Sequence, residues 1–324
     1  YNLKKILSEN ADYNIIIGER SNGKTYSTLE YILTDYVKNN NSGAYIRRWK
    51  DDIQGKRADT VFNALVENDV IRKLTDNEYA FSLSDVEHDK STSYPTVKNI
   101  VFDEFLTRRY YLPDEFVIFM NVLSTIIRDR ENIKIFMLGN TVNKYCPYFD
   151  EMGLTNISTM VQGSIDVYSF SNNLKIAVEY CSETKSGKKS NKYFAFDNPR
   201  LNMITSGKWE LAIYPHLPTG YKIKSDDILF TFYVIFGNKK LGCDVIQKDG
   251  DIFIFVRPQT TEIKENSLIY CLDYSPSMYQ RKSFLNPLDK IDSKIKGLFS
   301  CNRVFYQSND IGEIMHNYLL SCVK

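Results

Sequence analysis

Residues 18–25 read GERSNGKT, which fits the phosphate-binding pattern G-x-x-x-x-G-K-T. The glycines of such a loop let the backbone curve, so that consecutive N–H groups point at phosphate oxygens. A helix beginning near Lys24 would add the positive end of its dipole, Lys24 would reach the β- and γ-phosphates, and Thr25 would hold Mg²⁺. A chance match in a glycine-containing turn is the alternative, and the apolar run before the loop disfavours it. The residues predicted to bind the nucleotide are Gly18, Glu19, Arg20, Ser21, Asn22, Gly23, Lys24 and Thr25.

Two adjacent acids follow a hydrophobic run further along the chain. Residues 99–103 read NIVFD, and Glu104 comes next. An enzyme with a phosphate-binding loop needs such a strand, because it must hold Mg²⁺ and polarise the attacking water. We therefore expect Asp103 to support the Mg²⁺ shell and Glu104 to be the general base. An acidic strand end that faces solvent is the alternative, and the loop at 18–25 favours the catalytic interpretation.

Two further polar residues stand at the ends of predicted elements. Asn140 ends an apolar run, where its amide would contact the γ-phosphate or a water, although a turn asparagine fits the position equally well. Arg128 closes a helix that Pro113 is suited to begin. It is either a solvated cation at the negative helix end or a residue that reaches the γ-phosphate of a neighbouring subunit.

A basic segment with one tryptophan covers residues 47–57. Such a segment either contacts the phosphate backbone of a nucleic acid or forms ordinary surface. The candidate DNA contacts are Arg48, Lys50 and Lys56.

The elements that must position these residues alternate between strand and helix. Strand, helix and strand in succession predict a right-handed βαβ crossover in a parallel sheet, and open α/β sheets bind ligands at the carboxyl ends of their strands. The first half of the chain is therefore predicted to be α/β, with its polar groups gathered at one sheet edge. The predicted elements are strands 13–17, 44–50, 99–105 and 133–141 and helices 24–38, 58–74 and 113–128.

The pattern changes after about residue 165. A lysine- and serine-rich stretch over 182–192 has no apolar period and is typical of a loop or linker. Three strands joined by short turns follow, over 228–236, 241–247 and 252–256, and predict an antiparallel meander that precedes a weakly helical tail at 312–323. We predict a first domain over 1–182, a linker region over 183–220 and a second domain over 221–324.

The composition excludes several classes of protein. The 324 residues are 43% hydrophobic and 25% charged, as in globular proteins, and the length suits two domains. A net charge of +1 excludes a strongly basic chain, so DNA binding would need local patches. The scattered cysteines and histidines form no zinc pattern and no disulfide framework. The longest apolar run is too short to cross a bilayer and no signal-peptide pattern opens the sequence, so we expect a soluble intracellular protein with no membrane partner.

Several segments together resemble the phi29-like DNA-packaging ATPases of small tailed phages. The resemblance covers roughly the first half of the chain. The Tyr-Pro before the acidic strand, the Arg-x-Arg-Glu and the Cys-Pro-Tyr-Phe are more specific than the phosphate-binding loop. The segments that carry it are GERSNGKT at 18–25, YIRRWK at 45–50, SYPTVKNIVFDEF at 93–105, IRDRE at 127–131, Gly-Asn at 139–140 and NKYCPYF at 143–149.

This resemblance implies an additional-strand (ASCE) P-loop ATPase that uses ATP and Mg²⁺. It implies a homo-oligomeric ring, a pentamer in this family, which sits on the portal of a prohead and drives double-stranded DNA into it within the cytoplasm of an infected bacterium. Whether a structural RNA takes part stays open. By this match Arg128 is an arginine finger acting in trans, Lys90 lies in a lid segment that reaches the nucleotide, Arg20 is the loop arginine and Lys50 faces DNA.

The second half is similar to a degenerate RNase H-like nuclease domain, related to the one with which large terminases cut DNA. The strand at 228–236 has no acid in its interior, and the acids nearby lie mostly at strand ends or turns, so we expect no nuclease activity. Two other functions remain as alternatives to packaging: a P-loop helicase or recombinase-like ATPase, and a scaffold that binds nucleotide without hydrolysing it. The acids concerned are Asp226, Asp227, Asp244, Asp249 and Asp251.

Overall fold

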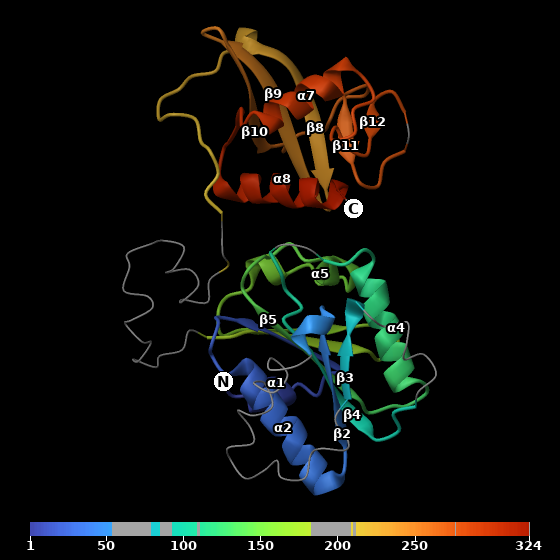
Figure 1. Ribbon diagram of the computed structural model, residues 1–324. Helices are drawn as coiled ribbons and strands as arrows, with labels where there is room; N and C mark the ends of the chain where they lie inside the picture. Colours follow the sequence, from blue (N-terminus) through green and yellow to red (C-terminus); the bar gives the residue numbers. More distant parts are fainter. Residues whose placement is uncertain are drawn as a thin grey trace. The chain divides into compact units, whose positions relative to one another are not determined.

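The computed structural model divides the chain into two compact units, Tyr1–Glu210 and Leu211–Lys324 (Figure 1). Each unit is described by itself. Two predicted site residues, Lys56 and Lys90, and the predicted helix at 58–74 lie outside the described residues. The structure describes residues 1–53, 79–84, 93–108, 111–182, 209, 212–275 and 277–323.

The first unit is built on a sheet of parallel strands with one antiparallel edge strand. Its strands are β1 (Tyr13–Gly18), β2 (Ser42–Arg47), β3 (Tyr79–Ser82), β4 (Val97–Asp103), β5 (Lys134–Asn140), β6 (Ile165–Ser169) and β7 (Lys175–Tyr180). Their spatial order among the described residues is β3-β2-β4-β5-β1-β7-β6, and β6 is the antiparallel strand. The additional strand that the ASCE prediction requires is β5, which lies between β1 and β4.

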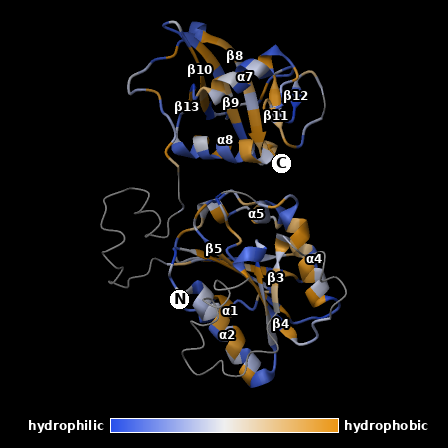
Figure 2. Cartoon of the chain, in the orientation of Figure 1, coloured by the Kyte–Doolittle hydropathy of each residue, from blue (hydrophilic) through white to orange (hydrophobic). Residues whose placement is uncertain are grey.

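Helices cover both faces of this sheet because its strands are apolar on both sides. Along β1, Ile15 and Ile17 pack into the core beneath α4, while Ile16 packs on the other face against α2. This alternation follows from the two-residue period of a strand. Hydrophobic residues run through the strands and along α4 (Figure 2). The helices are α1 (Lys4–Leu7), α2 (Lys24–Asn39), α4 (Glu115–Ile127) and α5 (Pro147–Glu151), with short 3-10 turns η1 (Lys50–Asp52) and η3 (Ile157–Thr159).

The second unit is an α+β domain, as predicted. Its antiparallel meander comprises β8 (Ile228–Phe236), β9 (Lys239–Lys248) and β10 (Asp251–Pro258), and a 3-10 turn, η4 (Ser225–Asp227), precedes it. The sheet order is β12-β11-β8-β9-β10-β13. The predicted helical tail is α8 (Asn309–Cys322). In this unit, the elements that the sequence did not predict are β11 (Ile269–Cys271), β12 (Gln280–Arg281), β13 (Val304–Tyr306) and α7 (Lys290–Ser300).

Residues 212–220 lie at the end of the predicted linker region and pack on this second unit. The backbone N–H of Tyr306 donates to the carbonyl of Pro215 at 2.8 Å, and the Tyr214 hydroxyl donates to Glu313 at 2.9 Å. The Tyr214 ring also covers Gly312, where a Cβ atom would come within 2.2 Å of it. These contacts attach this segment to α8 and β13.

Candidate nucleotide-binding site

Four strands of the first unit end side by side at one edge of the sheet. In the parallel register, Gly18 at the end of β1 pairs with Asn140 at the end of β5, and Asp103 at the end of β4 pairs with Leu138. The strand β2 ends at Arg47, next to β4. The carboxyl ends of parallel strands are where open α/β sheets bind ligands. The register therefore assembles the phosphate-binding loop, the acidic pair and Asn140 from segments far apart in the sequence.

A pocket of about 240 Å³ opens at this edge. It contains most of the residues that the sequence predicted to bind nucleotide, although Gly18, Glu19 and Arg20 are not part of its wall. Arg20 is exposed, whereas Glu19 is buried. The lining residues are Ser21, Asn22, Gly23, Lys24, Thr25, Tyr26, Asp103, Glu104, Leu138, Gly139 and Asn140.

The loop before α2 has the backbone that a phosphate cradle requires. Gly23 precedes the helix with φ 82°, in the left-handed region that favours glycine. A Cβ atom on Gly18 would come within 2.8 Å of the Cβ of Cys181. Because α2 begins at Lys24, inside the pocket wall, its first backbone N–H groups and its positive dipole end face the cavity. The structure thus places a helix N-terminus at the position where the sequence predicted phosphate binding.

Lys24 lines the same pocket. It is 6% exposed, and its ammonium donates to the Glu19 carbonyl at 2.7 Å, the Asn22 amide oxygen at 3.2 Å and the Asn140 amide oxygen at 3.3 Å. All three acceptors are neutral, so burial dominates and lowers the pKa of Lys24 to about 8. An anionic phosphate in the pocket would favour the charged form.

Thr25 and Asp103 together offer oxygen ligands of the kind that Mg²⁺ prefers. The Thr25 hydroxyl lies 3.3 Å from both carboxylate oxygens of Asp103, and the Tyr45 hydroxyl donates to one of them at 2.8 Å. Mg²⁺ is usually held by one or two such protein groups together with phosphate oxygens and water. This donor set fits that ion, and in the described part of the chain no cluster of three or more His, Cys, Asp or Glu side chains offers another metal site.

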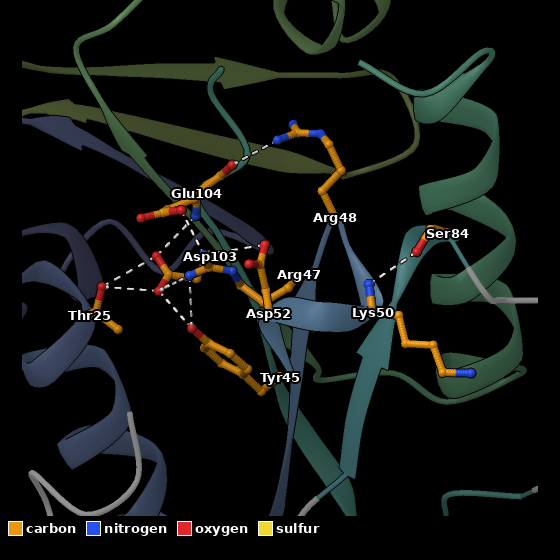
Figure 3. A network of polar contacts seen from close by, with 9 residues as sticks. All are labelled: Thr25, Tyr45, Arg47, Arg48, Lys50, Asp52, Ser84, Asp103 and Glu104. Atoms are coloured by element: carbon orange, nitrogen blue, oxygen red, sulfur yellow. Dashed lines mark hydrogen bonds and ion pairs between the residues drawn. The ribbon is translucent and has the colours of Figure 1, made fainter. Parts of the chain in front are cut away.

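Glu104 has an unusual backbone and an arginine partner that the sequence prediction missed. Its φ is 57°, and its side chain is 56% exposed. Arg47 donates to the Glu104 carboxylate at 2.6 Å and also lies 3.4 Å from Asp103 and 3.7 Å from Asp52 (Figure 3). Arg47 therefore joins the predicted general base, Glu104, to the predicted Mg²⁺ ligand, Asp103. The available signal in the sequence was the position of Arg47 near the end of a predicted strand.

The remaining predicted site residues fall in different environments. Lys50 is exposed, and Figure 3 shows its side chain extending away from the acidic pair. Arg48 is only 6% exposed, and its guanidinium donates to the buried Glu115 carboxylate at 2.7 and 2.9 Å. This burial argues against Arg48 as a DNA contact, because no charged surface is left for a phosphate backbone. Arg128 is exposed at the carboxyl end of α4, outside the pocket wall.

Comparison with known proteins places the chain in a family. The sequence model of the family described as "Podovirus DNA encapsidation protein (Gp16)" matches residues 1–265. The chain belongs to this family. The DNA packaging protein of Bacillus phage phi29 is 31% identical to it over 168 residues, which are 46% of this chain and 48% of the phage protein. The chain thus spans about half the length of the curated relatives it matches, which include the DNA packaging protein of Bacillus phage B103 at 30% identity and 50% of that protein.

Solved structures of two packaging motors share the fold of this Gp16 family member. The bacteriophage Phi-29 viral genome packaging motor assembly matches it with a TM-score of 0.61 and 21% identity, over 100% of this chain and 99% of that one. The Phi-28 gp11 DNA packaging motor matches with a TM-score of 0.58 and 18% identity, over 100% and 98%. Both likenesses extend over the two units and confirm the predicted fold class. In the part of the chain that the structure describes, no helix has the length and apolar character of a membrane span.

Proposed function

We propose that this chain is the ATPase of a phage genome-packaging motor, which hydrolyses ATP with Mg²⁺ and translocates double-stranded DNA. The observation that carries the proposal is the juxtaposition of Lys24, at the start of α2, with the acidic pair Asp103 and Glu104 in one pocket. Membership of the Gp16 family and the fold shared with packaging motors support the coupling to DNA. The sequence left two alternatives. A helicase would displace one strand of a duplex, whereas a non-hydrolysing scaffold would release no phosphate.

In this proposal the first unit binds the triphosphate at the start of α2. The backbone N–H groups of the loop and the Lys24 ammonium receive the phosphates, and the Asn140 amide, now paired with Lys24, is released toward the γ-phosphate. Thr25 and Asp103 would hold Mg²⁺, which neutralises charge on the β- and γ-phosphates when it is bound. The predicted lid residue Lys90 and loop residue Arg20 stay proposals as nucleotide contacts.

Glu104 is proposed to orient and deprotonate the attacking water. Arg47 holds its carboxylate at 2.6 Å through one of the two oxygens that could accept the proton of the water. Catalysis therefore requires that the Arg47 pair open, or that the water bind to the oxygen that Arg47 leaves free. The exposed position of Glu104 allows the side chain to make that movement.

Arg128 is proposed to complete the site of a neighbouring subunit. Next to it, Arg130 donates to the carbonyl oxygens of Pro95 at 3.0 Å and Val97 at 2.5 Å. Val97 begins β4, whose seven residues span about 20 Å before Asp103. The end of α4 thus lies at the sheet edge opposite to its own pocket, which supports a role for Arg128 in trans. A homo-oligomeric ring, five subunits by family resemblance, would supply that neighbour.

The partners and boundaries of the motor are part of the same proposal. The ring would attach to the portal of a prohead in the cytoplasm of an infected bacterium, with a structural RNA left open. Lys50, and Lys56 outside the described residues, would contact DNA. A linker within 183–220 would join the ATPase domain, 1–182, to the domain over 221–324, which we propose has no nuclease activity. If supercoiled plasmid is nicked or cut with Mg²⁺ or Mn²⁺, that last point is wrong.

Phosphate release by the purified full chain tests the enzymatic core. Lys24→Ala removes the cation of the proposed phosphate site and should lower the ATPase rate at least about 100-fold. Lys38→Ala, at the exposed far end of the same helix, is the matched control and should keep the wild-type rate. Wild-type turnover by Lys24→Ala would refute the assignment.

Mixing two inactive variants tests the action of Arg128 in trans. Arg128→Ala subunits keep an intact pocket but lack the finger, whereas Lys24→Ala subunits keep the finger but lack the pocket. If the finger acts across a subunit boundary, mixtures should recover part of the ATPase activity that each variant lacks alone. Absence of recovery at every mixing ratio would count against the trans role.

A further inference from the structure

The backbone of Glu104 adopts a conformation that must be held in place from outside. A φ of 57° lies in the left-handed region, where a side chain with a Cβ atom is disfavoured, and such residues persist only where their surroundings over-determine them. The Glu104 side chain is 56% exposed, and its contact with Arg47 is made at the carboxylate, at the far end of the side chain from the backbone. The constraint must therefore come from contacts to its main chain.

The Asp103 carboxylate accepts the Glu104 N–H at 3.0 Å, and Arg48 binds the carbonyl side of the same turn. Its guanidinium donates to the Glu104 carbonyl at 3.3 Å and to the Phe105 carbonyl at 2.7 Å. The first contact is drawn in Figure 3, where Arg47 and Arg48 approach Glu104 through different groups. Arg47 binds the Glu104 carboxylate, whereas Arg48 binds the main chain beneath it. Two consecutive arginines thus act on one acid in different ways.

The charge of Arg48 is fully compensated by a buried carboxylate. Glu115, with its side chain 1% exposed, receives Arg48 through two hydrogen bonds of 2.7 and 2.9 Å. The same carboxylate accepts the Leu112 N–H at 2.7 Å and the Tyr148 hydroxyl at 2.9 Å. Four donors therefore fix Glu115, and a planar guanidinium in a two-pronged pair has little freedom to rotate. The arrangement is rigid and connects the end of β4 to α4 and α5.

From this geometry we propose that Arg48, held by Glu115, is a positioning residue that fixes the main chain of Glu104 and thereby aims the catalytic carboxylate at the pocket. The inference rests on the proposed ATPase function. It gives Arg48 a role inside the protein in place of the DNA contact that the sequence suggested. Since Lys24 and Thr25 lie on α2, the network should influence turnover without changing nucleotide binding.

The variant Arg48→Lys tests this role, because lysine keeps the charge beside Glu115 but cannot hold the carboxylate and both carbonyls together. We expect kcat for ATP to fall about 100-fold, the size of effect that a small misplacement of a catalytic group produces. The Kd for ADP should stay within about twofold of the wild-type value, since only an interaction of the reacting state is lost. The control Arg281→Lys changes a comparable buried arginine pair in the second unit and should alter neither quantity.

Hydrogen exchange of the nucleotide-free protein gives a readout that does not depend on activity. The Phe105 N–H donates to the Leu138 carbonyl at 3.2 Å, so loosening of this turn should speed exchange in a peptide covering residues 103–107. The peptide covering β1 should be unaffected. Unchanged exchange at 103–107 in Arg48→Lys would overturn the inference, whether or not the wild-type chain hydrolyses ATP.

The double variant Arg48→Met/Glu115→Met separates positioning from stability, because it leaves no buried charge unpaired. A folded double variant with slow turnover supports positioning. The proposed positioning role is refuted if the double variant or Arg48→Lys has the wild-type kcat. It is also refuted if neither protein folds, because the network would then have a structural role alone. A folded wild-type chain without ATPase activity would instead refute the proposed function.

Discussion

Both units contain an aspartate on a sheet strand that faces an arginine, but the arginine is more distant from the aspartate in the first unit than in the second. Asp103, at the wall of the nucleotide pocket, accepts the Tyr45 hydroxyl at 2.8 Å and lies 3.3 Å from Thr25 and 3.4 Å from Arg47. Asp244, in the middle of β9, accepts the Thr231 hydroxyl at 2.7 Å and the Arg257 guanidinium at 2.8 Å. The long contacts of Asp103 to Thr25 and Arg47 can be exchanged for a cation, whereas the short contact of Asp244 to Arg257 already pairs that carboxylate with a positive charge.

The two aspartates differ in the charges that surround them. Beside Asp103 stand a helix amino terminus and the buried Lys24, which together attract an anion. Asp244 is 5% exposed, and Arg257 donates to both of its carboxylate oxygens, at 2.8 and 3.3 Å. The same pair of residue types is therefore a candidate catalytic site in the first unit and a structural ion pair in the second.

The largest expected effect is on ATP hydrolysis, from a substitution of Glu104. Glu104→Gln removes the proposed base but keeps the size of the side chain, so ATP hydrolysis should fall about 1,000-fold while nucleotide still binds. Phosphate release and equilibrium binding of ADP measure the two quantities. Glu30→Gln, on the exposed face of α2, serves as the matched control. Hydrolysis at the wild-type rate in Glu104→Gln would show that the first unit has no reactive carboxylate at this position.

A smaller effect is expected in the pH dependence of nucleotide binding, which tests the role of Lys24 in the first unit. Because burial lowers the pKa of Lys24 to about 8, the free protein loses this charge above pH 8, and the Kd for ADP should rise up to about tenfold by pH 9. Titration of ADP binding between pH 7 and 9 measures this change, with Glu104→Gln as the protein in order to separate binding from turnover. A Kd that stays constant over this range would contradict the prediction.

The same pKa has a consequence for folding. The unfolded chain keeps the Lys24 proton up to the ordinary lysine pKa of 10.5, whereas the folded chain releases it near 8. Between these values the unfolded state binds more protons, so the contribution of Lys24 to the free energy of unfolding increases as the pH rises. Below pH 8 the buried charge of Lys24 lowers the free energy of unfolding by a constant amount, and bound phosphate would offset this loss.

The smallest effect is expected in the second unit. Arg257→Leu removes the cation beside the buried Asp244 carboxylate and keeps the hydrogen bond from Thr231. It should lower the free energy of unfolding of this unit by about 1–3 kcal/mol without changing ATP hydrolysis. Chemical denaturation followed by hydrogen exchange of β9 peptides measures the loss.

The control for this variant is Arg303→Leu, because Arg303 and Asp251 form an exposed pair whose side chains are 51% and 71% accessible. Such a pair contributes less than about 1 kcal/mol. Equal losses from Arg257→Leu and Arg303→Leu would mean that Asp244 does not depend on its arginine, and the contrast between the two aspartates would lose its basis.

Local sequence patterns were enough to predict much of the fold around the site. The loop at 18–25, the strand that ends at Asp103 and the helix that begins at Lys24 all have short-range signals, namely glycine spacing, apolar runs and helical periodicity. The meander of β8, β9 and β10 was predicted by alternating apolar runs and intervening turns for the same reason. In these cases the structure confirmed the expected elements within a few residues.

Other elements lacked such signals. The strand β3 is four residues long and lies in a mixed polar stretch, and β7 includes a lysine and a glutamate, so neither reads as an apolar run. Their strand conformation depends on pairing with β2 and β1, which the sequence does not display. Tertiary pairing therefore decided the width of the sheet.

The sequence alone determined part of the site, but the roles of the two consecutive arginines were decided only by the tertiary structure. The sequence alone identified a phosphate-binding loop and an acidic strand end, because their chemistry depends on residues next to one another. Whether Arg47 and Arg48 face solvent, DNA or an acid depended on partners 56 to 67 residues away. A hydrogen bond requires donor and acceptor atoms about 3 Å apart, so the roles of these side chains were set by the folding that brought β2, β4 and α4 together.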